Sequence, residues 1–130
     1  MFNKKSFCFI VAFTFVMGCG EEKPVTVEGK FTIDGKSVEL KKTATIQITF
    51  HTLESNQAKA ISYPADFENE TLTYKINAIP KGRYKVEIAY LDPYPNRDRL
   101  NGSYSANKSN IQCDLKSNTS LDIDVSSKKK

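Results

Sequence analysis

The sequence predicts an all-β protein, a seven- to eight-stranded antiparallel β-sandwich of Greek-key type. Three observations lead to this fold class. Apolar and polar residues alternate with a period of two through most of the chain after Pro24, and no window shows a convincing helical period. The alternating segments also follow one another at intervals of about 8 to 12 residues, apart from one long gap, which is typical of β-sandwiches.

Five segments show the clearest alternation, with an apolar residue at every second position. In chain order they are residues 25–33, 44–51, 71–78, 84–90 and 121–125. This pattern is typical of half-buried strands that have one face in the core and one face in water. The core is expected to include seven of their apolar residues, namely Phe31, Ile48, Ile76, Tyr84, Val86, Ile88 and Ile123.

Two weaker strands are expected at residues 37–40 and 57–63. Asp34-Gly35 predicts a hairpin turn after the first strand, because both residue types tolerate the backbone conformation that a two-residue turn requires. Together with the five clear segments, these elements provide the strands of the predicted sandwich.

Residues 1–18 are predicted to form a cleaved signal peptide. Lys4 and Lys5 precede an almost unbroken apolar run of 11 residues, 7–17. A helix needs about 20 residues to cross the hydrocarbon core of a bilayer, so this run is too short to span it. A basic start followed by a short apolar stretch is typical of a secretory signal.

The end of this segment, Val16-Met17-Gly18-Cys19, resembles the lipobox of bacterial lipoproteins. The resemblance implies cleavage between Gly18 and Cys19, and attachment of diacylglycerol and fatty acid (palmitate) chains to Cys19. These chains would anchor the protein to a membrane of the cell envelope. The Gly that follows Cys19 favours the outer membrane, with the domain in the periplasm or at the cell surface. Residues 19–24 are then the lipidated cysteine and a tether that reaches at most about 18 Å.

The part of the chain expected to fold carries almost no net charge. The whole sequence has a net charge of +4, with 19 basic residues. Lys4 and Lys5 belong to the signal and three more lysines to a basic tail at 127–130, which leaves 14 basic residues against 15 acidic ones. A nucleic-acid-binding fold needs a basic face, so no nucleic-acid partner is predicted for the sandwich domain, residues 25–126.

The position of the basic tail depends on the number of strands. If every connection reverses direction, seven strands place the tail at the end away from the membrane, and eight place it beside the membrane.

Few residues are available for catalysis or metal binding. Cys8 leaves with the signal and Cys19 is lipidated, so Cys113 has no disulfide partner and is expected to be a buried residue of a strand. His51 is the single histidine, and the alternation places it on the face in water. A zinc site usually takes several His or Cys ligands. We therefore predict no metal, no cofactor and no catalytic residue, and we expect Cys113 and His51 on opposite faces.

Two stretches resemble carboxypeptidase-regulatory-like domains. Residues 29–50 begin Gly-Lys-Phe-Thr-Ile-Asp-Gly-Lys and end Ala-Thr-Ile-Gln-Ile-Thr-Phe, and residues 79–86 resemble the Pro-x-Gly-x-Tyr-x-Val signature of those domains. The resemblance implies a non-catalytic, transthyretin-like (prealbumin-like) sandwich carried by a lipoprotein. Asn69 stands where the hairpin of these domains usually has Gly, and is expected to adopt a left-handed conformation there. An immunoglobulin- or fibronectin-like sandwich is the alternative fold.

The long gap, residues 92–110, is the candidate recognition loop. Tyr94 and Tyr104 offer amphipathic contact area, and Arg97 and Arg99 offer planar donors for carboxylates or sugar hydroxyls. The predicted function is a non-catalytic envelope lipoprotein that presents a binding or structural module close to the membrane. Its partner would be an envelope protein or polysaccharide. A small envelope hydrolase with an unrecognised active site is the alternative.

Overall fold

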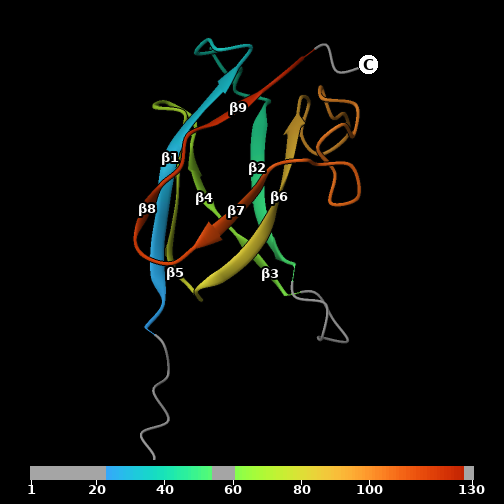
Figure 1. Ribbon diagram of the computed structural model, residues 1–130. Coiled ribbons are helices and arrows are strands. Elements are labelled where there is room, and N and C mark those ends of the chain that lie inside the picture. Colours follow the sequence, from blue (N-terminus) through green and yellow to red (C-terminus); the bar gives the residue numbers. More distant parts are fainter. Residues whose placement is uncertain (1–22, 54–60, 128–130) are drawn as a thin grey trace, which may run out of the picture.

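A computed structural model describes residues 23–53 and 61–127. The predicted signal peptide, Gly18, Cys19 and most of the tether lie outside the described residues, as do Lys128–Lys130. The described chain forms nine strands in two packed sheets (Figure 1). In chain order the strands are β1 (Val25–Ile33), β2 (Thr45–Thr52), β3 (Ser62–Pro64), β4 (Asp66–Glu68), β5 (Thr73–Ile79), β6 (Gly82–Leu91), β7 (Gln112–Leu115), β8 (Thr119–Ser120) and β9 (Ile123–Val125).

The two sheets confirm the predicted all-β sandwich. One sheet has the order β4-β5-β1-β8, with β9 also paired to β1, and the other has the order β3-β2-β6-β7. Two chain segments each supply two of the nine strands. β3 and β4 belong to different sheets and are separated by Ala65, and β8 and β9 follow one another along the same edge of β1. Counted as segments, the strands number seven, which is the lower of the two numbers predicted.

The closing segment runs parallel to β1, whereas all other pairs are antiparallel. Ile33 is the register partner of Val125. The chain therefore reaches Ser127 at the end of the sandwich opposite to Lys23, where the described chain begins (Figure 1). This is the geometry expected for seven segments, so the membrane contact considered for the basic tail in the eight-strand case is not proposed.

The turn after β1 forms as predicted, but the strand expected at 37–40 does not. Asp34 and Gly35 both have positive φ (52° and 74°), and Ile33 and Lys36 exchange two backbone hydrogen bonds of 3.0 Å. β5 and the β8–β9 segment already occupy the two edges of β1. Residues 37–40 therefore have no free edge of β1 on which to continue the hairpin.

The core is built from the faces that the alternation predicted. All seven predicted core residues are buried, each less than 10% exposed. The alternation breaks near the end of β5, where a register shift against β1 buries Ile79 and leaves Ala78 exposed. The left-handed residue before β5 is Leu72 (φ 53°) rather than Asn69 as predicted. The buried Leu72 side chain and the bond from the Phe31 N–H to the Leu72 carbonyl (2.8 Å) hold it there.

Candidate functional site

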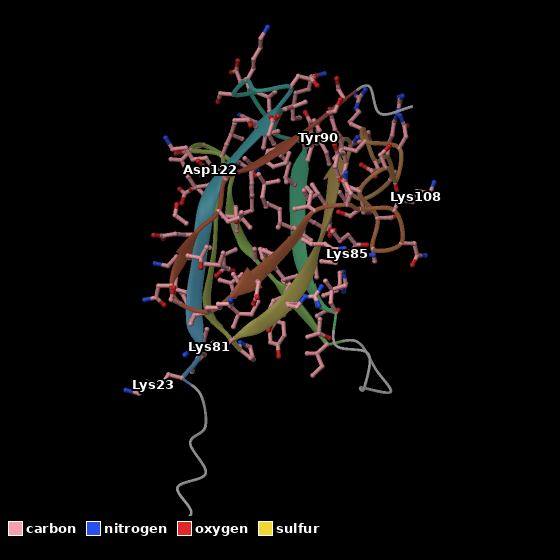
Figure 2. The ribbon with its side chains drawn as sticks, in the orientation of Figure 1. Lys23, Lys81, Lys85, Tyr90, Lys108 and Asp122 are labelled. Atoms are coloured by element: carbon pink, nitrogen blue, oxygen red, sulfur yellow. The ribbon has the colours of Figure 1, made fainter. Side chains whose placement is uncertain are left out.

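The predicted recognition loop, residues 92–110, connects β6 to β7 at the end of the sandwich opposite to Lys23. Figure 2 shows Lys23 at one end of the molecule and Lys108 on the outside of this loop. The backbone N–H of Tyr94 donates to the carbonyl of Thr43 (2.8 Å), which places the start of the loop beside the β1–β2 connection. The loop therefore lies at the end that is distant from the N-terminal tether.

Asp98 organises the first half of the loop. Its carboxylate accepts hydrogen bonds from the backbone N–H groups of Tyr90 (3.1 Å), Leu100 (2.9 Å) and Gly102 (2.9 Å). The Arg99 N–H also donates to the Tyr90 carbonyl (2.7 Å). A carboxylate that accepts several backbone N–H groups fixes the course of the chain around it, so this long connection is a defined structure.

Arg99 faces the base of the loop. The side chain of Asp92 is buried, and its carboxylate lies 3.3 Å from the Arg99 guanidinium and accepts a bond from the Thr43 hydroxyl (3.0 Å). The Arg99 Nε also donates to the Asp92 carbonyl (3.1 Å). Arg99 therefore neutralises and satisfies a buried carboxylate.

Tyr104 is part of the core. It is 6% exposed, its hydroxyl accepts a bond from the Ser126 N–H (2.8 Å), and its carbonyl accepts one from the Ile88 N–H (2.9 Å). Of the four residues predicted for recognition, Tyr94, Arg97 and Arg99 lie on the surface. Tyr94 is 54% exposed, and the Arg99 side chain is 40% exposed although it also pairs with Asp92. The recognition surface of this loop therefore loses Tyr104 and keeps Tyr94, Arg97, the exposed part of Arg99 and their exposed neighbours.

A second polar cluster lies on the outer face of the four-stranded sheet. His51 Nδ1 is 2.7 Å from the Ser62 hydroxyl, and His51 Nε2 is 3.3 Å from the Glu87 carboxylate. The other oxygen of Glu87 accepts the Ala106 N–H (2.8 Å), which ties the recognition loop to the sheet. Sequence reasoning placed His51 on this face correctly but did not identify Ser62, because Ser62 becomes its neighbour only through the pairing of β2 with β3.

Cys113 lies on the opposite face of the same sheet, as expected. It is the register partner of the buried Tyr84, while His51 is the partner of Lys85. Burial, and then the neighbouring Asp114, raise the pKa of Cys113 to about 11. The thiol is therefore protonated at neutral pH and is a poor nucleophile.

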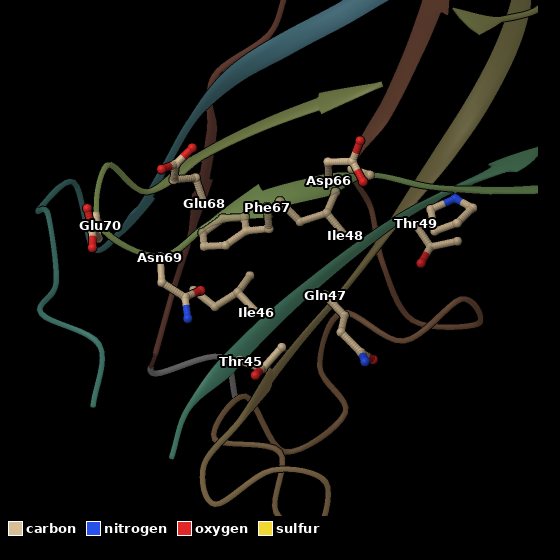
Figure 3. Close-up of a pocket in the computed structure, with 12 residues that line it drawn as sticks. Thr45, Ile46, Gln47, Ile48, Thr49, Asp66, Phe67, Glu68, Asn69 and Glu70 are labelled. Atoms are coloured by element: carbon tan, nitrogen blue, oxygen red, sulfur yellow. The ribbon is translucent and has the colours of Figure 1, made fainter. Parts of the chain in front are cut away.

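A groove of about 770 Å³ lies between β2 and β4, shown in Figure 3. Ile46, Ile48 and Phe67 provide its apolar lining, and acidic residues line the β4 side. The sequence prediction missed this groove. One available signal was Pro64, which has no N–H to continue a strand ladder and so favours the end of pairing at that position.

Within residues 23–53 and 61–127, no three His, Cys, Asp or Glu side chains come together as a group that could hold a metal ion. The same residues contain no helix with the length and apolar character needed to cross a membrane. Comparison with family models, with curated proteins and with solved structures finds no match to this chain.

Proposed function

We propose that this protein is a non-catalytic lipoprotein of the bacterial cell envelope, in which a carboxypeptidase-regulatory-like sandwich presents a binding surface to an envelope protein or polysaccharide. One observation carries the proposal. The described chain enters the fold at Lys23, four residues after the proposed lipid attachment site Cys19, whereas the loop with exposed Tyr94 and Arg97 lies at the other end. A nine-residue strand such as β1 spans about 30 Å, so the point at which the described chain begins and the proposed surface are separated by about the length of the sandwich.

The alternative, an envelope hydrolase, would use the Ser62–His51–Glu87 cluster. A hydroxyl, an imidazole and a carboxylate in sequence are the groups that activate a serine nucleophile. Here they sit on the outer surface of a sheet and away from the large groove. Glu87 also holds the Ala106 N–H, a structural contact. These features favour a structural role for the cluster, and we place the hydrolase second.

Replacing the proposed lipid attachment site, Cys19→Ser, is expected to abolish incorporation of labelled palmitate and to move the protein out of the membrane fraction. The reason is that a serine lacks the sulfur that forms the thioether. The measurement is fractionation of cells together with fatty acid labelling. Cys113→Ser is the matched control, because it removes the other cysteine of the mature chain, and it should stay acylated and membrane-bound. A Cys19→Ser protein that sediments with membranes like the wild type would contradict the lipoprotein proposal.

Replacing the two arginines of the loop one at a time is expected to affect partner binding in one case and the unfolding free energy in the other. Arg97→Ala should leave the unfolding free energy nearly unchanged and weaken binding to isolated envelope protein or polysaccharide fractions, because Arg97 is exposed. Arg99→Ala should lower the unfolding free energy by about 1–3 kcal/mol, since it leaves the buried Asp92 carboxylate without its cation. Urea unfolding and binding to the immobilised fractions measure the two effects. Unchanged binding by a well-folded Arg97→Ala protein would place the surface elsewhere.

A further inference from the structure

The first half of β2 has a free edge. β3 pairs only with residues Thr49 to His51, and the chain then crosses to the other sheet. On the side of β2 facing away from β6, no strand of the described chain pairs with residues 45–48. The groove of Figure 3 lies along this edge.

The ladder between β2 and β6 shows which backbone groups face the groove. Ile48 lies opposite Ile88, and the Ile88 N–H donates away from β2, to the Tyr104 carbonyl. Ile46 lies opposite Tyr90, whose N–H also donates away from β2. Residues of an antiparallel strand direct both backbone groups alternately to one neighbour and then to the other.

Three backbone groups of β2 are therefore available to a new strand. The N–H and the carbonyl of Ile46 and the N–H of Ile48 point into the groove. The Ile48 carbonyl confirms the direction, since it accepts the Ala65 N–H (2.9 Å) on that side. These are the donors and acceptors that an added strand requires.

The opposite wall of the groove is β4, which is itself an edge strand paired only with β5. Its three residues are Asp66, Phe67 and Glu68. The Phe67 ring packs edge-on against Phe31 at 6.0 Å between centroids, and it closes the bottom of the groove with the buried Ile46 and Ile48. An entering chain would thus find apolar surface for its inward side chains.

The charge of the groove indicates which kind of chain would bind there. Asp66, Glu68 and Glu70 line it, all three are exposed, and the lining contains no Lys, Arg or His. Among the described residues, none of these three carboxylates lies within 4.0 Å of a basic group. A second copy of this chain paired through the same edge would bring two acidic linings together, which is repulsive. A basic strand would be attracted.

We propose that this groove binds an extended, lysine- or arginine-rich segment of a partner protein, which adds to the free half of β2 as a further strand. Its backbone pairs with Ile46 and Ile48. Its inward side chains contact Phe67, and its basic side chains meet the carboxylates of Glu68 and Glu70. This proposal does not depend on the lipid anchor or on the loop at 92–110.

The test uses the full-length protein in a non-ionic detergent and a fluorescent, end-capped peptide of alternating Lys and Val. Fluorescence anisotropy should show saturable binding, and hydrogen exchange of the Ile46 and Ile48 amides should slow by at least ten-fold when the peptide is bound. The same peptide with alternate backbone nitrogens methylated keeps its charge but loses strand hydrogen bonds. We expect it to bind at least ten-fold more weakly.

Two variants test whether the peptide binds in the groove or is held by general charge attraction. Glu68→Gln combined with Glu70→Gln should weaken peptide binding at least five-fold, whereas Asp114→Asn, which removes an exposed carboxylate from β7, should leave it unchanged. Equal binding of the methylated peptide, or unchanged exchange at Ile46 and Ile48, would overturn the proposal in favour of a diffuse electrostatic contact. Concentration-dependent dimers that protect the same amides without peptide would overturn it in favour of self-pairing.

Discussion

Gly29→Ala is expected to destabilise the domain by about 3 kcal/mol, a large effect for the addition of one methyl group. A Cβ atom at position 29 would lie 2.0 Å from the backbone oxygen of Leu121 and 2.6 Å from its carbonyl carbon. Both distances are far below any van der Waals contact, and the obstacle is backbone rather than the end of a flexible side chain. One of the two segments would have to move.

Neither segment can move without losing hydrogen bonds. The Leu121 N–H donates to the Glu28 carbonyl (2.8 Å), and the Leu121 carbonyl accepts a bond from the hydroxyl of Tyr74 (2.5 Å). Tyr74 is 2% exposed, and burial is the largest cause that raises the pKa of its hydroxyl, so that hydroxyl stays a donor at physiological pH. Displacing Leu121 would leave a buried hydroxyl without its acceptor, which is costly.

Chemical unfolding of Gly29→Ala and Glu28→Ala measures this effect against a matched control. Glu28 precedes Gly29 on the same strand but points to solvent, where its ion pair with Lys75 is long (3.8 Å) and both side chains are more than half exposed. Glu28→Ala should therefore change the unfolding free energy by less than about 1 kcal/mol. Equal losses for the two variants would show that the close approach at Gly29 is not what stabilises the closing segment.

The sandwich could be predicted from the sequence because burial on one face of a strand leaves a local signature. The alternation around Phe31 and Ile48 identifies the core face without knowledge of the partner strand. Which strands pair with one another cannot be predicted in this way. That β8 and β9 run parallel to β1, or that β3 and β4 belong to different sheets, depends on residues far apart in sequence. Period-two alternation contains no information about which strand lies beside which.

The candidate sites also include some features that the sequence predicts and some that it does not. The unusual composition of residues 92–110 was visible in the sequence, and so was the surface character of Tyr94 and Arg97. The pairing of Arg99 with the buried Asp92 and the packing of Tyr104 in the core could not be predicted. An exposed arginine that also pairs with a buried aspartate has the same local sequence as one that contacts only solvent. The groove was not predicted, since it results from the point at which β3 leaves β2; Pro64 signals the end of that pairing but not what lies beyond it.

Ile48→Ala is expected to lower the unfolding free energy by about 2–5 kcal/mol, and Thr49→Ala beside it by no more than about 1 kcal/mol. Ile48 is 1% exposed and lies opposite Ile88, which is also 1% exposed, at the centre of the β2–β6 ladder. Truncation would remove buried methyl groups and leave a cavity that neighbouring strands cannot fill without losing their hydrogen bonds.

Thr49 points to the other face of the same strand, opposite Glu87 and Pro64, where solvent reaches it. The two variants have the same backbone hydrogen bonds and differ in the face that is truncated, so urea unfolding of both isolates the contribution of burial. A similar loss for each would mean that β2 is packed on both faces. The outer face would then be covered by another surface, and the strand would no longer be the half-buried element that the period-two alternation predicts.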